Sequence, residues 1–274
     1  QSVYKMPKKY FEQFDCVIGD EAHMFKAKSL TSIMTKLHQC KYRFGFTGTL
    51  DGTETHRLVL EGLFGSVEQV VTTKELIDKK TLANLKIKCI TLKHPEKRER
   101  MTYAEELDYL VSKESRNRFI LDLCNTISGN TLVLFQLVEK HGKILYDGMK
   151  EKENVYFVYG GTDTDQREKI RGLVEKHKNS TTIASYGTFS TGINIRNIHN
   201  IVLASPSKSK IRVLQSIGRG LRTSSTKDSI LIFDIADDIS YKDRRNFTLN
   251  HFFERLNIYN EQQFNYEISK VKIK

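Results

Sequence analysis

The stretch Cys16-Val17-Ile18-Gly19-Asp20-Glu21-Ala22-His23 decides the fold that the sequence predicts. Val17 and Ile18 are β-branched and lie in a short apolar run, which is typical of a buried strand in a parallel sheet. Two adjacent carboxylates follow at the carboxyl end of that strand, where parallel sheets bind their ligands. Asp20 is therefore a candidate Mg²⁺ ligand, and Glu21 is a candidate for orienting or deprotonating a water molecule beside a nucleotide. Taken alone, the two acids also fit an ordinary solvated strand end.

The composition indicates a basic α/β protein. The 274 residues include 44 Lys and Arg against 33 Asp and Glu, a net charge of +11. This balance favours polyanionic partners, nucleic acid first, although a merely basic protein also fits it. No apolar run approaches the ~20 residues that span a bilayer, and no signal-peptide pattern opens the chain, so we expect a soluble cytoplasmic protein. The four cysteines are widely separated and predict reduced thiols, not a zinc site or a disulfide framework.

The second half of the sequence repeats an alternation of strands and helices. Apolar runs predict strands at residues 131–135, 155–159, 181–185, 201–204 and 230–235, with helical patterns between them. Before this pattern, residues 94–100 form a charged stretch that contains a proline, which is typical of a boundary between domains.

The segment from Gln215 to Arg222 has the pattern Q-x-x-G-R-x-x-R. Arg219 and Arg222 are three residues apart, so a helix would place both guanidinium groups on one face, within reach of a single polyphosphate. Gly218 and Gly220 each cost a helix about 1 kcal/mol relative to alanine, which suggests that something approaches the helix closely there. Two arginines on a surface helix, without this pattern, would usually have no catalytic role.

Several of these segments resemble, in order, the motifs of superfamily 2 helicases of the DEAH-box kind. Asp20-Glu21-Ala22-His23 resembles the Walker B segment, or motif II, and Thr47-Gly48-Thr49 resembles motif III. Residues 187–195 resemble motif V, and Q-x-x-G-R-x-x-R resembles motif VI. The resemblance implies an α/β fold of RecA-like parallel-sheet domains. Residues 1–93 would be the C-terminal part of the first domain, 94–112 a linker, 113–240 the second domain, and 241–274 an extension packed on it.

The resemblance also assigns roles to individual residues. Asp20 would hold the magnesium ion, Glu21 would activate water, and His23 with Gln215 would link the two domains through the nucleotide. Arg219 and Arg222 would stabilise charge on the transferred phosphoryl group. The remaining motif residues would couple the sites or bind a ligand: Thr47, Gly48 and Thr49 for coupling, Gly192 and Asn194 for the nucleotide, and Thr188 and Ser190 for nucleic acid.

One family element is absent from the sequence. The phosphate-binding loop G-x-x-x-x-G-K-[ST] does not occur, and in the family it lies upstream of motif II. We therefore expect this chain to lack an N-terminal part of the same protein and to have little ATPase activity alone. The resemblance implies ATP and Mg²⁺ as cofactors and DNA as partner, with remodelling of branched DNA or RNA–DNA hybrids in recombination and repair. The alternative is a nucleic-acid-binding fragment without catalysis.

Overall fold

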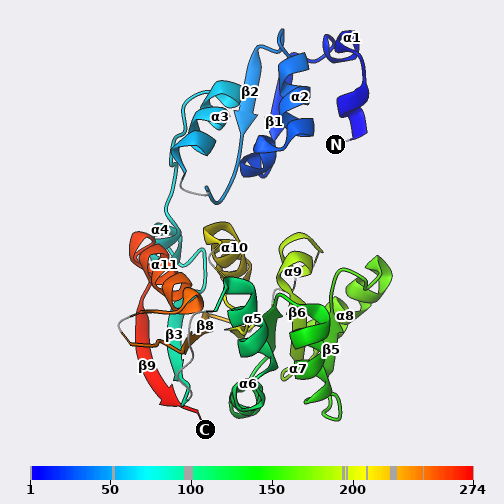
Figure 1. The fold of residues 1–274 in the computed structure, drawn as a ribbon. Helices are drawn as coiled ribbons and strands as arrows, with labels where there is room; N and C mark the ends of the chain where they lie inside the picture. Colours follow the sequence, from blue (N-terminus) through cyan, green and yellow to red (C-terminus); the bar gives the residue numbers. More distant parts are fainter. Residues whose placement is uncertain are drawn as a thin grey trace. The chain divides into compact units, whose positions relative to one another are not determined.

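The computed structural model of the chain describes residues 2–50, 53–95, 101–192, 195, 197–207, 209–222, 227–242 and 244–273. It separates into two compact units, the first built on residues 1–70 and the second on residues 71–208 and 212–274 (Figure 1). No helix in the described ranges is long and apolar enough to cross a membrane.

The first unit is a small parallel sheet with helices on one face. Strands β1 (Cys16–Gly19) and β2 (Tyr42–Gly45) pair in register, with Cys16 opposite Tyr42 and Gly19 opposite Gly45. The helical segments are η1 (Ser2–Lys5), α1 (Lys8–Phe11), η2 (Ala22–Lys26), α2 (Lys28–Lys36) and α3 (Glu54–Phe64). A core that includes Phe11, Phe25, Met34 and Leu60 lies between these helices and the strands.

The prediction that β1 is a buried strand is wrong for this structure. Ile18 is 67% exposed, whereas Val17 packs against the core of the first unit. Successive side chains of a strand point to opposite faces, so only one face of β1 meets the helices. Phe44, on β2 opposite Ile18, is 49% exposed on the same open face. The apolar sequence therefore marks a strand that could be covered on both faces, but the described residues cover only one.

The second unit contains a seven-stranded sheet with the order β5-β6-β4-β7-β8-β3-β9, in which every neighbouring pair is parallel. In chain order the strands are β3 (Asn84–Lys93), β4 (Thr131–Phe135), β5 (Val155–Val158), β6 (Thr181–Ser185), β7 (Asn200–Leu203), β8 (Ser229–Asp238) and β9 (Tyr266–Lys272). The helices are α4 (Thr73–Asp78), α5 (Tyr103–Ser112), α6 (Glu114–Thr126), the π-helical turn η3 (Val138–Gly142), α7 (Lys143–Asp147), α8 (Thr164–Lys176), α9 (Tyr186–Gly192), α10 (Lys210–Gly220) and α11 (Phe247–Glu261).

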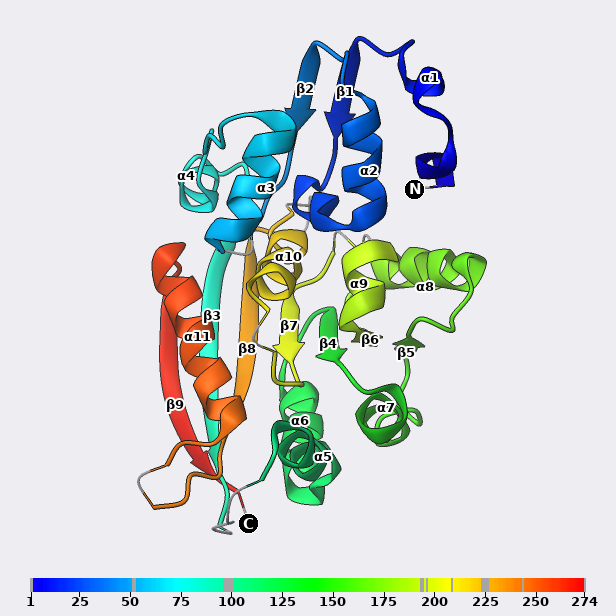
Figure 2. The ribbon, with the colours of Figure 1, turned by 45° about the horizontal axis from the view of Figure 1, so that its top comes forward.

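Helices cover both faces of this sheet and create two cores. On one face the core takes Ile217 from α10 and Phe252 from α11, and these two helices lie over the strands in Figure 2. On the opposite face the core takes Ile120 from α6 and Leu145 from α7. The expected α/β class with a parallel sheet is therefore confirmed, and the unit has the three layers of a doubly wound fold.

The boundary between the units differs from the predicted one. Strand β3 was expected at the end of a first domain, but it pairs with β8 on one side and β9 on the other, inside the second sheet. The expected linker contains α5, whose buried Glu106 accepts hydrogen bonds from the backbone of Phe247 and Thr248 at the start of α11. A carboxylate at a helix N-terminus satisfies amides that have no partner within the helix, so α5 is a fixed part of this unit.

Candidate functional site

The two predicted carboxylates of motif II lie on a tight turn after β1. Two backbone hydrogen bonds continue the pairing of β1 and β2 to either side of this turn. Phe46 N donates to the Gly19 carbonyl and Ala22 N donates to the Phe46 carbonyl, each at 2.8 Å. Glu21 has φ 50° and ψ 51°, the left-handed region, and its amide donates to Asp20 Oδ1 at 2.8 Å. Such a conformation costs a non-glycine residue of order 1 kcal/mol or more and is concentrated at functional sites. Both side chains are exposed.

Two facing glycines bring the ends of β1 and β2 close to α3. A Cβ atom on Gly19 would lie 2.9 Å from Phe64 Cζ, and one on Gly45 would lie 2.9 Å from Phe64 Cγ. Real Cβ atoms do not come this close, so glycine is needed at both positions for the Phe64 ring to pack over the strands. This packing positions the turn of motif II beside the segment that follows β2.

His23 connects motif II directly to motif III. Its ring is buried, and Nδ1 lies 2.9 Å from Thr47 Oγ1 and 3.2 Å from Glu21 Oε2. The Thr47 hydroxyl donates its one proton to the Thr49 carbonyl at 2.9 Å, so it must accept from His23. Nδ1 of His23 therefore carries a proton. The structure thus brings together three of the predicted residues, Glu21, His23 and Thr47, while the Thr49 hydroxyl is buried nearby without a hydrogen-bond partner among the described residues.

Motif V begins in the short helix α9, directly after β6. Thr188 is 4% exposed, and its Oγ1 lies 2.8 Å from Ser185 Oγ at the end of β6. The prediction that its hydroxyl faces nucleic acid does not fit this burial, because the hydroxyl is engaged in fixing the start of α9. Gly192 is the last residue of α9, and Ser190 lies within it. Asn194 lies outside the described residues.

Motif VI is only partly helical. Gln215 and Arg219 lie on α10, but the helix ends at Gly220, so Arg222 follows it and is exposed. The prediction that both arginines share one helical face is therefore wrong. Arg219 lies over the buried ring of Phe189 in α9, with Cζ 5.7 Å from the ring centroid, a cation–π contact that ties motif VI to motif V.

The glycines of motif VI have different surroundings. A Cβ on Gly220 would lie 2.2 Å from Ile230 Cδ1 and 2.8 Å from Ile201 Cδ1, whereas one on Gly218 would meet nothing within 4 Å. The predicted close approach is therefore present at Gly220, where the sheet approaches the helix. At position 218 the described residues give no steric reason for a glycine.

A buried ion pair on one face of the sheet holds the connector between β7 and α10, residues 204–207. Arg116 of α6 donates to the Ala204 carbonyl at 2.7 Å, and its Nε lies 2.9 Å from Asp237 Oδ1. Burial alone would raise the pKa of Asp237, but Arg116 and a hydrogen bond from His94 outweigh it and keep the pKa below its ordinary value. Burial and the charge of Arg116 lower the pKa of His141 to about 3, so its neutral ring can bind Ser205 Oγ at 2.8 Å.

A second buried ion pair holds the connector from the opposite face. Arg255 of α11 donates to the Ser207 carbonyl at 3.0 Å, and its Nη2 donates to Asp234 Oδ1 at 2.7 Å. The other carboxylate oxygen of Asp234 accepts a hydrogen bond from the Tyr259 hydroxyl at 2.8 Å. Breaking a buried pair typically costs about 3–5 kcal/mol, so residues 204–207 are firmly fixed. The sequence analysis missed these residues. Two acids inside the apolar run of β8 were the available signal, because a buried acid needs a partner.

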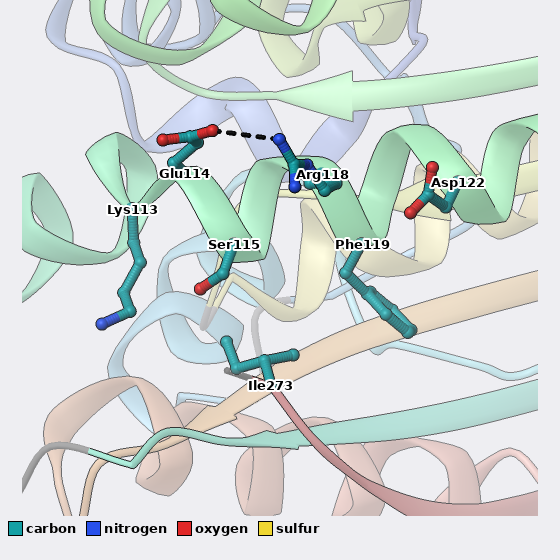
Figure 3. Close-up of a pocket in the computed structure, with 7 residues that line it drawn as sticks. All are labelled: Lys113, Glu114, Ser115, Arg118, Phe119, Asp122 and Ile273. Carbon is teal, nitrogen blue, oxygen red and sulfur yellow. Dashed lines mark hydrogen bonds and ion pairs between the residues drawn. The ribbon is translucent and has the colours of Figure 1, made fainter.

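A shallow pocket of about 650 Å³ lies apart from all predicted site residues. It is lined by the first turns of α6 and by Ile273 (Figure 3). Glu114 and Arg118 form an ion pair of 3.2 Å beside it. Opposite charges that already neutralise each other favour no charged ligand, and we assign the pocket no role.

Comparisons with known proteins agree with the order of the motifs. Residues 1–52 match the family model "Type III restriction enzyme, res subunit", and residues 105–224 match "Helicase conserved C-terminal domain". The whole chain is 35% identical to the "ATP-dependent DNA helicase uvsW" of Enterobacteria phage T4 and spans 58% of that protein's length.

Solved structures give the same result for the fold. The crystal structure of T4 UvsW matches 99% of this chain with a TM-score of 0.62 and 34% identity, and 57% of that chain is covered. Dbp5 of S. cerevisiae, solved with RNA and ADP BeF3, matches 98% of this chain with a TM-score of 0.57, and 63% of that chain is covered. At 13% identity the second likeness shows the fold alone. With motifs II, III, V and VI on their expected segments, the chain belongs to the superfamily 2 helicases.

Proposed function

We propose that this chain carries two parts of the ATP-hydrolysing site of a DNA helicase or translocase: motifs II and III in the first unit and motifs V and VI in the second. The observation that carries the proposal is the strained turn that presents Asp20 and Glu21, with His23 bonded to Thr47 behind it. An ordinary solvated strand end needs neither a left-handed residue nor a buried histidine behind it. Both features fit a site that binds a nucleotide and passes its state to motif III.

The residues of the first unit fit a magnesium–ATP complex. Mg²⁺ prefers oxygen ligands and usually takes only one or two carboxylates, with phosphate and water oxygens completing its shell. Asp20 and Glu21 supply two exposed carboxylates, and the described ranges hold no group of three or more His, Cys, Asp or Glu side chains that could bind a metal ion by themselves. When bound, the ion would neutralise phosphate charge. Asp20 would hold it, and Glu21 would orient and deprotonate the attacking water.

The residues of the second unit would complete the site from the other half of the chain. Arg219 and Arg222 are proposed to stabilise the charge that develops on the phosphoryl group. Gln215, together with His23, would link the two halves through the nucleotide. Gly192 and Asn194 would lie at the nucleotide sugar, and Ser190 at nucleic acid. Thr47, Gly48 and Thr49 would relay the state of the nucleotide, since Thr47 already contacts His23.

DNA is the proposed substrate. The net charge of +11 supports a polyanionic partner, and the phage relative is described as an ATP-dependent DNA helicase. Remodelling of branched DNA and of RNA–DNA hybrids, in recombination and repair, is the finer proposal. A panel of forked, junction, hybrid and linear duplexes, unwound by the full-length protein in the presence of ATP, would test that preference.

Glu21→Gln tests the core of the proposal in the full-length gene product. It should leave ATP affinity within about twofold of wild type and reduce DNA-stimulated turnover by about 10²- to 10⁴-fold, the contribution of a general base. Glu61→Gln is a matched control, because Glu61 forms an ion pair with Arg57 of 2.8 Å on the surface of α3 and such pairs contribute little. Normal turnover in Glu21→Gln, with weakened ATP binding, would show that Glu21 is not the base.

The second candidate function is nucleic-acid binding without catalysis. The missing phosphate-binding loop and the basic composition favour it. It predicts that the full-length gene product shows no ATP turnover on any nucleic acid. Glu21→Gln would then have no turnover to reduce.

A further inference from the structure

The end of α10 is anchored from several directions. The last carbonyl groups of any α-helix lack partners within the helix and must be satisfied from elsewhere. In α10 the amide of Leu221 still donates to the Ile217 carbonyl at 2.9 Å, and the Leu221 carbonyl accepts the amide of Ala83 at 2.9 Å. Leu221 is itself 0% exposed. Arg222 is the next residue, and it is exposed.

Lys227 supplies a further anchor at this helix end. Its side chain is buried, with the whole residue 2% exposed, and Nζ donates to the carbonyl of Gly220, the last residue of α10. Lysine is almost never fully buried unless it is paired, and burial lowers the pKa of Lys227 to about 8. A cation at a helix C-terminus meets the negative end of the helix dipole, which favours this placement.

Gly220, whose carbonyl accepts from Lys227, lies close against the sheet. With no Cβ, its backbone lies directly against the side chains of Ile201 and Ile230 at the start of β7 and β8. Gly220 is itself buried. A buried carbonyl without a donor destabilises the fold, so the helix end needs Lys227 or a substitute.

We propose that Lys227 is a positioning residue for Arg222, holding the end of α10 so that the exposed arginine starts from a fixed backbone. This inference rests on the proposed role of Arg222 at the phosphoryl group. An arginine that acts only when a site closes gains from a backbone that does not have to be ordered at that moment. A displacement of about 1 Å from productive geometry can cost about 10²-fold in rate.

Lys227→Met tests the inference, because methionine keeps a long unbranched side chain and removes both the charge and the donor. In the full-length gene product we expect kcat for ATP to fall by about 10- to 100-fold, with KM within about twofold of wild type. Lys227→Arg, which keeps a cation and donors, should recover most of the loss. Lys74→Met is the control, since Lys74 pairs with Asp78 on the exposed surface of α4.

Amide hydrogen exchange on residues 217–222 provides a readout that does not depend on catalysis. In Lys227→Met the protection of this segment should fall by about tenfold or more, whereas β4 and β6 should exchange as in wild type. If Lys227→Met does not fold, Lys227→Gln, which keeps a donor without the charge, takes its place in both measurements.

The outcomes separate the two proposals. Faster exchange with a lower kcat supports the positioning role, and unchanged exchange overturns it. Faster exchange with an unchanged kcat also overturns it, because Lys227 would then be structural only. If wild type itself shows no ATP turnover, the proposed function fails and the positioning role fails with it. The exchange result then still decides whether Lys227 caps α10.

Discussion

Arg219 and Arg222 are held in different ways, although both belong to one motif. Arg219 lies on α10 over the ring of Phe189, so its guanidinium group already has a packing partner in motif V. Arg222 follows the end of the helix and is exposed. Truncating Arg219 therefore removes packing as well as charge. A change at Arg222 should affect the chemistry with little effect on folding, which makes it the cleaner test of an arginine finger.

Arg222→Ala in the full-length gene product should reduce ATP turnover by roughly 10³-fold or more, with little change in nucleotide affinity, as other arginine fingers do. Arg222→Lys should recover little, because a lysine keeps the charge but lacks the planar fork. Steady-state kinetics together with equilibrium nucleotide binding give both quantities. Normal turnover combined with a lower melting temperature would mark Arg222 as structural, and motif VI would lose its assignment.

The pKa of Lys227 predicts a pH dependence of folding. Its folded-state pKa is about 8, below the ordinary 10.5, so between these pH values the unfolded chain binds more protons. The free energy of unfolding therefore rises as the pH increases from about 8 to 10.5. In the other direction, this stability is lost as the pH falls toward about 8, where the buried amine becomes charged. Relative to Lys227→Met, the free energy of unfolding of wild type should increase by about 1.4 kcal/mol per pH unit at most.

Urea unfolding at pH 7.5, 8.5 and 9.5 would measure this difference. The comparison with Lys227→Met is necessary because Cys124 contributes in the opposite direction. Burial raises the pKa of that thiol from its ordinary value of 9 to about 12. As the pH rises above 9, the thiol ionises more readily in the unfolded chain, and the free energy of unfolding falls. A constant difference between the two proteins over this range would contradict the lowered pKa of Lys227.

At the scale of helices and strands, local sequence signals predicted much of the second unit. Thr102 and Glu105 have the sequence spacing of a capping box and form one at the start of α5, and Asp163 caps α8 by accepting from the amide of Gln166. The strands at residues 131–135 and 181–185 have the predicted bounds. These features depend on residues close together in sequence, which is why a single sequence can show them.

The misses at this scale depend on tertiary packing. α10 ends at Gly220, before Arg222, and the strands that lie against Gly220 come from segments that no local pattern connects to it. The pairing partners of β3 lie more than a hundred residues later in the chain. Likewise, the sequence did not predict the hydrogen bond between His23 and Thr47, whose geometry comes from the pairing of β1 with β2.

The packing of β1 and β2 against α3 gives a paired prediction with alanine. Gly45→Ala would place a methyl group 2.9 Å from Phe64 Cγ and 3.1 Å from Ala22 Cβ, and such overpacking costs about 1–3 kcal/mol. Gly62→Ala, inside α3, would meet nothing within 4 Å and should stabilise the helix by about 0.5–1 kcal/mol. Chemical unfolding monitored in the first unit should show a lower free energy of unfolding for Gly45→Ala and a higher one for Gly62→Ala. Equal effects would mean that Phe64 does not pack as described.

At the scale of the whole molecule, the net positive charge and the absence of a phosphate-binding loop from the sequence lead to one prediction for the isolated chain. It should bind nucleic acid through phosphate contacts, without base preference, and its affinity should fall steeply as salt rises. It should hydrolyse ATP very weakly or not at all, because the sequence lacks the phosphate-binding loop. Salt titrations with two unrelated DNA sequences, beside an ATPase assay, would test both. Salt-insensitive binding or helicase-like turnover would contradict the prediction.

The position of β3 has a consequence for how the protein is made. This strand leaves the ribosome well before its two neighbours in the sheet, β8 and β9, which begin at Ser229 and Tyr266. Both edges of β3 must therefore stay unpaired while residues 94–228 are synthesised. Unpaired edges invite aggregation, and pairings between distant segments form slowly. During translation the sheet of the second unit is therefore completed only when β9 emerges, and a nascent chain that stops before β9 leaves one edge of β3 exposed.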